Sequence, residues 1–199
     1  MDEQTLPVFL YDFNSPYAYL AAARVDEVLP VRPRWQPIAF AFMLRAHGRT
    51  PWSFDDRGRE LGIAECERRA KLYGLPAMRW PPGWPVQSYG LISLRAAIVA
   101  EDQDLLREFS RAAFARNFML GRGLKDIDDV LAVAEEVGLD PDVIKRKVVS
   151  EVKDRLAGAT EAAIAAGAVG VPTVLTSGQS FWGDDQLEAA ATAVSSNQP

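Results

Sequence analysis

Ser15 stands at a position that suits the binding of another molecule's thiolate. It follows the apolar segment 8–13 and precedes Pro16, at a strand–helix junction where a disulfide-exchanging enzyme would carry Cys-x-x-Cys. Here Ser15 and Ala18 occupy the two positions, so no disulfide can form between them. Serine is a good helix N-cap, proline suits the first helical position, and the amides at a helix N-terminus favour negative charge. The junction therefore predicts a site that stabilises a thiolate, whereas the simpler interpretation is an ordinary helix cap.

A second motif, far along the chain, favours the ligand-binding interpretation. Val171 and Pro172 follow Gly170 in a turn that enters a β-branched strand, and proline is tolerated at the first position of a strand. A proline there can be preceded by a cis bond, and the residue before it then offers its backbone N–H and C=O groups to an extended ligand. We predict a cis Val171–Pro172 bond that faces Ser15 across a cleft, because both must contact one thiol ligand.

The expected strands lie near the two ends of the chain. A strand at 7–12, a helix at 16–29 and a strand at 34–39 form a βαβ unit with a parallel pair of strands. Strands at 172–176 and 179–182 form a hairpin, and a helix follows at 184–194. Helical spacing and capping residues predict further helices at 53–73, 91–98, 105–116, 127–137, from 141 onward and at 152–166, with an irregular connection at 76–85.

This order predicts an α/β protein with a thioredoxin-like fold that is split by an all-helical insertion. The thioredoxin-like domain would comprise residues 1–40 and 168–199. The insertion domain would comprise residues 41–167, including the helix that returns to the sheet.

Composition narrows the classes of protein that remain. With 22 basic and 27 acidic residues the net charge is −5, which argues against non-specific binding of nucleic acid. Cys66 is the only cysteine and His47 the only histidine, so we expect neither an intrachain disulfide nor a structural metal, and we interpret Cys66 as incidental. Residues 1–6 do not resemble a signal peptide, and no apolar run is long enough to span a membrane. These features predict a cytoplasmic protein.

Three motifs in order along almost the whole chain resemble a known family. They are Tyr-Asp-Phe-Asn-Ser-Pro-Tyr at 11–17, Val-Gly-Val-Pro-Thr at 169–173 and Phe-Trp-Gly-Asp-Asp-Gln-Leu at 181–187. The chain resembles the kappa-class glutathione transferases and the 2-hydroxychromene-2-carboxylate isomerases, which are cysteine-free relatives of the DsbA-type oxidoreductases. The resemblance implies a DsbA/kappa-class type of fold and glutathione, or another low-molecular-weight thiol, as the cofactor.

The resemblance also implies roles for individual residues. Ser15 would donate a hydrogen bond to the thiolate, and Val171, before a cis Pro172, would pair with the cysteinyl backbone of the thiol. Asp184 and Asp185 would hold the γ-glutamyl end. The chain departs from the family at Gly-Asn-x-Pro-Pro, where it has Gly48-Arg49-Thr50-Pro51.

Arg49 is our first candidate for binding an anionic group of the substrate, because a guanidinium suits carboxylates; the alternative is an exposed loop arginine. Trp52, Trp80, Trp84 and Phe118 are candidates for an apolar wall, although aromatic residues more often belong to the core. Trp80 and Trp84 lie in the irregular segment, so we expect them at the lip of the pocket.

Together these observations predict a glutathione-dependent isomerase of aromatic carboxylates, similar to 2-hydroxychromene-2-carboxylate isomerase, with Ser15 as the residue that stabilises the thiolate. The partner would be a small aromatic carboxylate, and a homodimer is left open. Alternatives are a kappa-class-like glutathione transferase, a redox-inactive DsbA-like ligand-binding protein, and an isomerase that uses no thiol. In every case we expect no disulfide-exchange activity.

Overall fold

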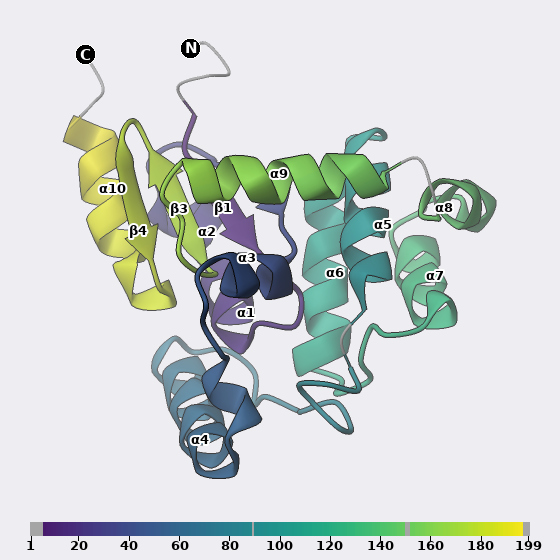
Figure 1. The fold of residues 1–199 in the computed structure, drawn as a ribbon, viewed down its shortest axis with the longest axis horizontal. Helices are drawn as coiled ribbons and strands as arrows, with labels where there is room; N and C mark the ends of the chain where they lie inside the picture. The colour runs from purple at the N-terminus through teal and green to yellow at the C-terminus, as the bar shows by residue number, and fades with distance from the viewer. Residues whose placement is uncertain (1–5, 89, 150–151, 197–199) are drawn as a thin grey trace.

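The computed structural model describes residues 6–88, 90–149 and 152–196. Its sheet has four strands in the order β2-β1-β3-β4: β1 (Val8–Tyr11), β2 (Arg34–Pro37), β3 (Thr173–Thr176) and β4 (Gln179–Trp182). Strand β1 is parallel to β2 and antiparallel to β3, and β3 is antiparallel to β4. The parallel pair and the C-terminal hairpin are therefore confirmed, and the last strands return beside the first (Figure 1).

The predicted helix at 16–29 is two helices in the structure. Helix α1 (Pro16–Ala22) ends at Ala23, and α2 (Val25–Val28) begins after Arg24. Arg24 leaves the helical conformation with a φ of −124°. Its guanidinium then reaches Glu188, the carbonyl of Asp184 and the face of the Tyr73 ring. These partners are 49 or more residues away in the chain, so nothing near Arg24 in the sequence indicates the break.

Between β2 and β3, every regular element of the described residues is helical. The first is α3 (Phe40–Ala46), which the sequence pattern did not predict. The short 3₁₀ helix η2 (Trp52–Phe54) and the long α4 (Asp56–Leu72) replace the single predicted helix at 53–73. The others are α5 (Leu91–Glu101), α6 (Leu106–Phe118), α7 (Ile127–Glu136), α8 (Pro141–Lys147) and α9 (Lys153–Ala165).

The chain ends with a 3₁₀ turn and a helix. The turn η3 (Asp184–Gln186) directly follows β4, and α10 (Leu187–Ser196) continues from it. In Figure 1, α10 lies at the sheet end of the molecule and α5 to α8 lie at the opposite end. Helix α4 contacts α1, while α9 contacts α3, α5 and β2.

An aromatic core joins the sheet to α6. Phe9, Tyr11 and Phe13 follow one another on the buried side of β1 and its extension, and Tyr11 packs against Trp35 of β2 and Phe114 of α6. Buried side chains of this size each stabilise the fold by about 1.5–3 kcal/mol. The hydroxyl of Tyr11 is also 2.6 Å from that of Ser110 on α6. This packing fixes the segment that leads into Ser15.

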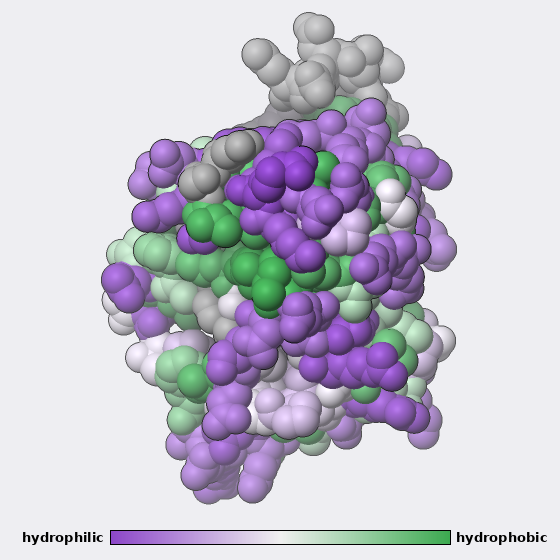
Figure 2. Space-filling model, turned by 90° about the vertical axis from the view of Figure 1, so that its right-hand side faces the viewer, coloured by the Kyte–Doolittle hydropathy of each residue, from purple (hydrophilic) through white to green (hydrophobic). Residues whose placement is uncertain are grey.

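Hydrophilic residues cover much of the face shown in Figure 2. Figure 2 shows the end formed by α7 and α8, where a band of hydrophobic residues crosses the middle between hydrophilic regions. No helix among the described residues has both the length and the hydropathy required to cross a membrane.

Candidate active site

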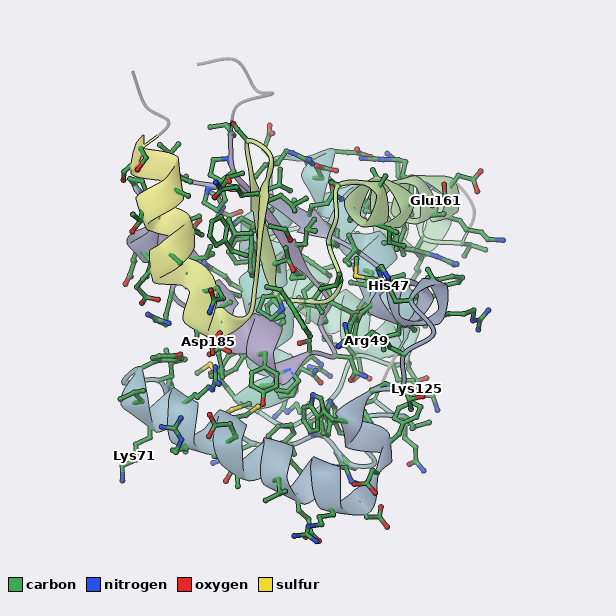
Figure 3. All side chains as sticks on the ribbon, turned by 60° about the vertical axis from the view of Figure 1, so that its left-hand side comes forward. His47, Arg49, Lys71, Lys125, Glu161 and Asp185 are labelled. Atoms are coloured by element: carbon green, nitrogen blue, oxygen red, sulfur yellow. The ribbon has the colours of Figure 1, made fainter. Side chains whose placement is uncertain are left out.

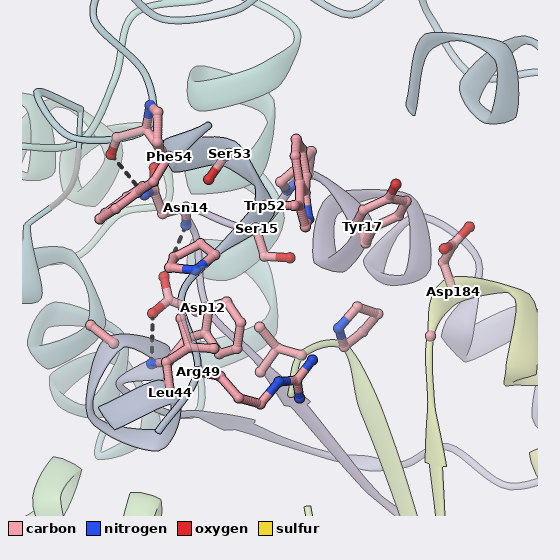
Figure 4. A pocket seen from close by; sticks show the side chains of 18 of the residues that line it. Asp12, Asn14, Ser15, Tyr17, Leu44, Arg49, Trp52, Ser53, Phe54 and Asp184 are labelled. Atoms are coloured by element: carbon pink, nitrogen blue, oxygen red, sulfur yellow. Dashed lines mark hydrogen bonds between the residues drawn. The ribbon is translucent and has the colours of Figure 1, made fainter. Parts of the chain in front are cut away.

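A cavity of about 600 Å³ lies where the loop after β1 meets α3, η2 and the turn before β3. It brings together eight of the residues singled out in the sequence: Ser15, Arg49, Trp52, Trp84, Val171, Pro172, Asp184 and Asp185. These residues come from both ends of the chain and from the helical region between them (Figure 4).

Ser15 is the N-cap of α1, as predicted. Its Oγ accepts a hydrogen bond of 3.2 Å from the backbone N–H of Ala18, and Pro16 occupies the first helical position. The backbone N–H of Ser15 donates to the carbonyl of Asp12 at 3.0 Å, which holds the turn closed. Within the part of the chain that the structure describes, no acceptor is hydrogen-bonded to the Ser15 O–H. The hydroxyl can therefore donate its hydrogen to a group in the cavity while its lone pair stays on the helix.

The Val171–Pro172 bond is cis, which confirms that prediction, and both residues line the same cavity as Ser15. The carbonyl of Pro172 accepts from the N–H of Gly183 at 2.9 Å, which ties the turn to the end of β4. The backbone N–H and C=O of Val171 have no hydrogen-bond partner among the described residues. That edge suits an extended ligand that pairs as an added strand does.

The two acidic residues of η3 differ in whether their carboxylate oxygens are already hydrogen-bonded and in how exposed they are. Asp184 is buried, and its two carboxylate oxygens accept from Arg69 at 2.8 Å and from the Tyr73 hydroxyl at 2.9 Å. Burial raises the pKa of Asp184, while Arg69 and Tyr73 act in the opposite direction. The Asp185 carboxylate lies 3.2 Å from Arg69, and about half of its side chain remains exposed. Asp185 is thus the member of the pair that can bind a cationic group.

Arg49 is fixed at the rim of the cavity by two contacts. Its Nη1 donates to the carbonyl of Val169 at 2.8 Å, and its guanidinium lies 4.7 Å from the centroid of the Trp182 ring. Gly170 also lies against this ring: a Cβ added to it would lie 2.4 Å from Nε1 of Trp182, so only glycine allows this approach. No carboxylate of the described residues lies within 4.0 Å of Arg49. An oriented, unpaired cation at this position suits an anionic ligand group.

Figure 3 shows Arg49 near His47, on the side of α3, and Asp185 on the side of α10. His47 contacts the carbonyl of Ala168 through Nε2 at 3.2 Å. Residues 47–49 therefore bind the backbone just before the cis-proline turn at two points.

Two of the four candidates for the aromatic wall, Trp80 and Phe118, do not line the cavity. Trp52 and Trp84 line the cavity, but Trp80 does not. The indole N–H of Trp80 donates to Glu67 at 2.9 Å, and its ring packs 4.7 Å from that of Trp84 and 5.6 Å from that of Phe118. The hydrogen bond to Glu67 holds Trp80 against α4. From there Trp80 packs against Trp84, which lines the cavity. Phe118 is fully buried and belongs to the core.

Several apolar residues of the wall carried no signal in the sequence. Phe54 and Val86 line the cavity and are more than half exposed. Phe40 and Leu44 reach it from α3, the helix that was not predicted. Their side chains make the cavity predominantly apolar between its polar ends.

Asp12 is buried beside the cavity, and both of its carboxylate oxygens accept hydrogen bonds. Its Oδ1 accepts from the N–H of Asn14 at 2.9 Å and its Oδ2 from the N–H of Phe40 at 3.0 Å. Burial raises the pKa of Asp12 to about 6, although both hydrogen bonds act in the opposite direction. Asp12 thereby caps α3 across the molecule and holds it against the Ser15 loop.

Asn14 joins the Ser15 loop to the irregular segment that follows α4. Its Nδ2 donates to the carbonyl of Pro85 at 2.9 Å, and its Oδ1 accepts from the Ser88 hydroxyl at 3.2 Å. Its backbone carbonyl accepts from the indole N–H of Trp84 at 3.0 Å. The position of the Trp84 wall relative to Ser15 therefore depends on Asn14.

Neither a reactive thiol nor a metal cluster contributes to this cavity in the described part of the chain. Cys66 lies on α4 with no exposed surface, and burial raises the pKa of its thiol to about 12. No group of three or more His, Cys, Asp or Glu side chains among the described residues is placed to hold a metal ion.

Comparison with known proteins agrees with this architecture. The family model of the DSBA-like thioredoxin domain matches residues 8–195. A 2-hydroxychromene-2-carboxylate isomerase from Sphingobium xenophagum is 27% identical over 190 residues, which cover 90% of this chain and 93% of that protein.

Solved structures show the same fold. A 2-hydroxychromene-2-carboxylate isomerase superposes with a TM-score of 0.83 at 23% identity, over 96% of this chain and 95% of the other. A probable DsbA oxidoreductase from Streptomyces coelicolor superposes with a TM-score of 0.71 at 17% identity, over 98% and 92% of the two chains. The chain therefore has a thioredoxin-like fold of the DsbA type, with a mixed sheet and many helices.

Proposed function

Because the chain belongs to the family of DSBA-like thioredoxin domains, we propose that it is a thiol-dependent isomerase of a small aromatic carboxylate, similar to 2-hydroxychromene-2-carboxylate isomerase. Glutathione, or another low-molecular-weight thiol, is the proposed cofactor. One observation carries the proposal: a single cavity contains the free Ser15 hydroxyl, the unpaired backbone edge of Val171 and the unpaired cation of Arg49.

The residues present fit a peptide-like thiol. The N–H and C=O of Val171 have room to pair with its backbone, and the exposed carboxylate of Asp185 suits an ammonium group at one end. Ser15 then donates its free hydrogen bond to the sulfur, which favours the thiolate over the thiol. Asp184 acts indirectly, because its two oxygens are already bound by Arg69 and Tyr73.

When bound, the thiol supplies a nucleophilic sulfur that adds to an electrophilic carbon and leaves again, so that no thiol is consumed. The protein's own residues orient the acceptor for that step. Arg49 binds its carboxylate from a fixed position, and the wall of Trp52 and Trp84 packs against its ring. Ser15 would stabilise the negative charge of the thiolate, the form in which sulfur attacks and leaves, through its free O–H.

The direct test measures isomerisation of 2-hydroxychromene-2-carboxylate by absorbance, with and without glutathione, and quantifies free thiol at the end. We expect turnover that needs catalytic glutathione and leaves its concentration unchanged. Turnover without any thiol would identify a thiol-free isomerase, and stoichiometric loss of thiol would identify a transferase. No turnover, with thermal stabilisation by peptides but not by thiols, would identify a ligand-binding protein.

A further inference from the structure

Two glycines of α4 lie directly beneath Trp52. Gly58 lies in the first turn of α4, and Gly62 lies one turn later in the helix interior. Glycine is a poorer helix former at interior positions than every residue except proline. A Cβ added to Gly62 would lie 2.1 Å from Cζ3 of Trp52 and 2.5 Å from Cη2. A Cβ added to Gly58 would lie 2.7 Å from the Trp52 carbonyl oxygen. The two glycines therefore let η2 and the Trp52 ring rest on the backbone of α4.

The Trp52 ring is also held at its sides, and its remaining surface is available. The ring of Tyr17 meets it edge-on at 6.0 Å, and that of Trp84 lies 5.7 Å away. Trp52 nevertheless keeps 37% of its surface exposed, and it lines the same cavity as Ser15 (Figure 4). A ring that is fixed from behind and open to the cavity is a preformed surface for stacking.

We propose that Trp52 is the platform on which the aromatic ring of the acceptor stacks, and that Gly62 determines the size of acceptor that fits. The identity of that acceptor as an aromatic carboxylate rests on the proposed function. Since α4 lies behind the ring, a methyl group at position 62 moves Trp52 toward the cavity. The movement needed is at least about 1.3 Å, the difference between 2.1 Å and the 3.4 Å at which ordinary van der Waals contact begins. That is more than a third of the about 3.5 Å that separates carbon atoms in contact.

The test compares the binding of benzoate and 2-naphthoate to the wild-type protein and to Gly62→Ala by titration calorimetry, without any thiol. We expect Gly62→Ala to weaken binding of 2-naphthoate by about ten-fold or more, since misfit in an apolar pocket costs that much, and binding of benzoate by less than about three-fold. The readout is the ratio of the two affinities, which a general loss of stability does not change.

Gly158→Ala is the matched control. Gly158 lies in the interior of α9, and a Cβ added there would meet nothing within 4 Å. The substitution should leave both affinities unchanged and raise Tm by about 2–4 °C, because alanine is the better helix former. Gly62→Ala gains the same helix propensity, so a loss of 2-naphthoate binding in a folded variant comes from the displaced ring.

A Trp52→Ala background shows whether the effect passes through the ring. We expect Gly62→Ala to leave the affinity ratio unchanged in that background. An unchanged ratio in the single variant, a persistent change without Trp52, or no binding of either carboxylate to the wild type would each overturn the inference. If Gly62→Ala does not fold, Trp52→Phe tests the same space, because the smaller ring enlarges the cavity in place of narrowing it. That substitution should shift the affinity ratio toward 2-naphthoate. These binding measurements contain no thiol, so they test the inference even if the proposed dependence of the activity on a thiol proves wrong.

Discussion

Replacing Ser15 with alanine removes two interactions that can be measured separately. The first is the cap: the 3.2 Å bond from Ala18 to Oγ is lost. Loss of such a cap costs about 0.5–2 kcal/mol, and the long distance places this one in the lower half of that range. The second is the hydrogen bond that the free Ser15 O–H donates to the bound thiolate in the proposed mechanism.

The second loss determines the rate. A hydrogen bond to a charged group is worth about 1.5–3 kcal/mol, which corresponds to roughly a 10- to 150-fold lower kcat/KM if it is made mainly in the transition state. The same loss raises the pKa of the bound thiol by about one to two units. We therefore expect the acid limb of the pH–rate profile to move to higher pH in Ser15→Ala.

Asp140→Ala separates the two effects. Asp140 caps α8 with a 2.8 Å bond from the N–H of Asp142, and a proline follows it as Pro16 follows Ser15. It does not line the cavity. Unfolding in urea should show a loss of stability in both variants, at least as large in Asp140→Ala because its capping bond is shorter. Steady-state kinetics with glutathione should show a loss of rate only in Ser15→Ala. Equal kcat/KM in wild type and Ser15→Ala, with unshifted pH profiles, would refute the role of Ser15.

Substitutions at three further residues test the rest of the site. Arg49→Ala should lower kcat/KM for a carboxylate-bearing acceptor by roughly 10- to 150-fold, the worth of a charge-assisted hydrogen bond, and should leave its methyl ester unaffected; Arg49→Lys should not restore the rate, because lysine lacks the planar fork. Asn14→Ala should raise KM for the acceptor more than for the thiol, since the substitution removes the hydrogen bonds to Pro85 and Ser88 but leaves the backbone of Val171 in place. The folded-state pKa of Asp12 is raised from 3.8 to about 6, so the folded protein binds this proton more tightly than the unfolded chain, and the free energy of unfolding should fall by up to about 3 kcal/mol as pH rises from 4 to 6 and then stay level. Asp12→Asn should make that slope shallower in urea titrations at pH 4 to 7, while the raised pKa of Asp184 keeps a remainder of the same sign. The substitution should also cost about 1–3 kcal/mol because asparagine cannot accept from both backbone N–H groups.

The parts of the fold that were predicted correctly depend on local signals. The cap at Ser15 involves only residues within one helical turn, and Pro16, which begins α1, is the next residue in the sequence. The hairpin of β3 and β4 closes around a glycine with positive φ at position 178, and the chain carries Ser177-Gly178 there. In each case the residues that determine the conformation are neighbours in the sequence.

The parts that were missed depend on distant partners. Helix α3 has no side-chain cap of its own, and its first N–H is bound by Asp12, 28 residues earlier. The choice of Trp52 over Trp80 for the cavity wall depends on Gly62 beneath one ring and Glu67 beside the other. The residues themselves were visible in the sequence, but which side of a helix or loop meets the cavity is determined by tertiary packing.

The burial of Cys66 has a consequence for the chemical environment in which the protein can operate. With a thiol pKa of about 12, its thiolate fraction at pH 7 is on the order of 10⁻⁵, and the sulfur has no exposed surface. Exchange with a dissolved disulfide requires both a thiolate and access to it. The protein itself should therefore stay unmodified in a mixed pool of reduced and oxidised thiols. Under the proposed function, its activity would then follow the concentration of reduced thiol and not the redox potential of the pool.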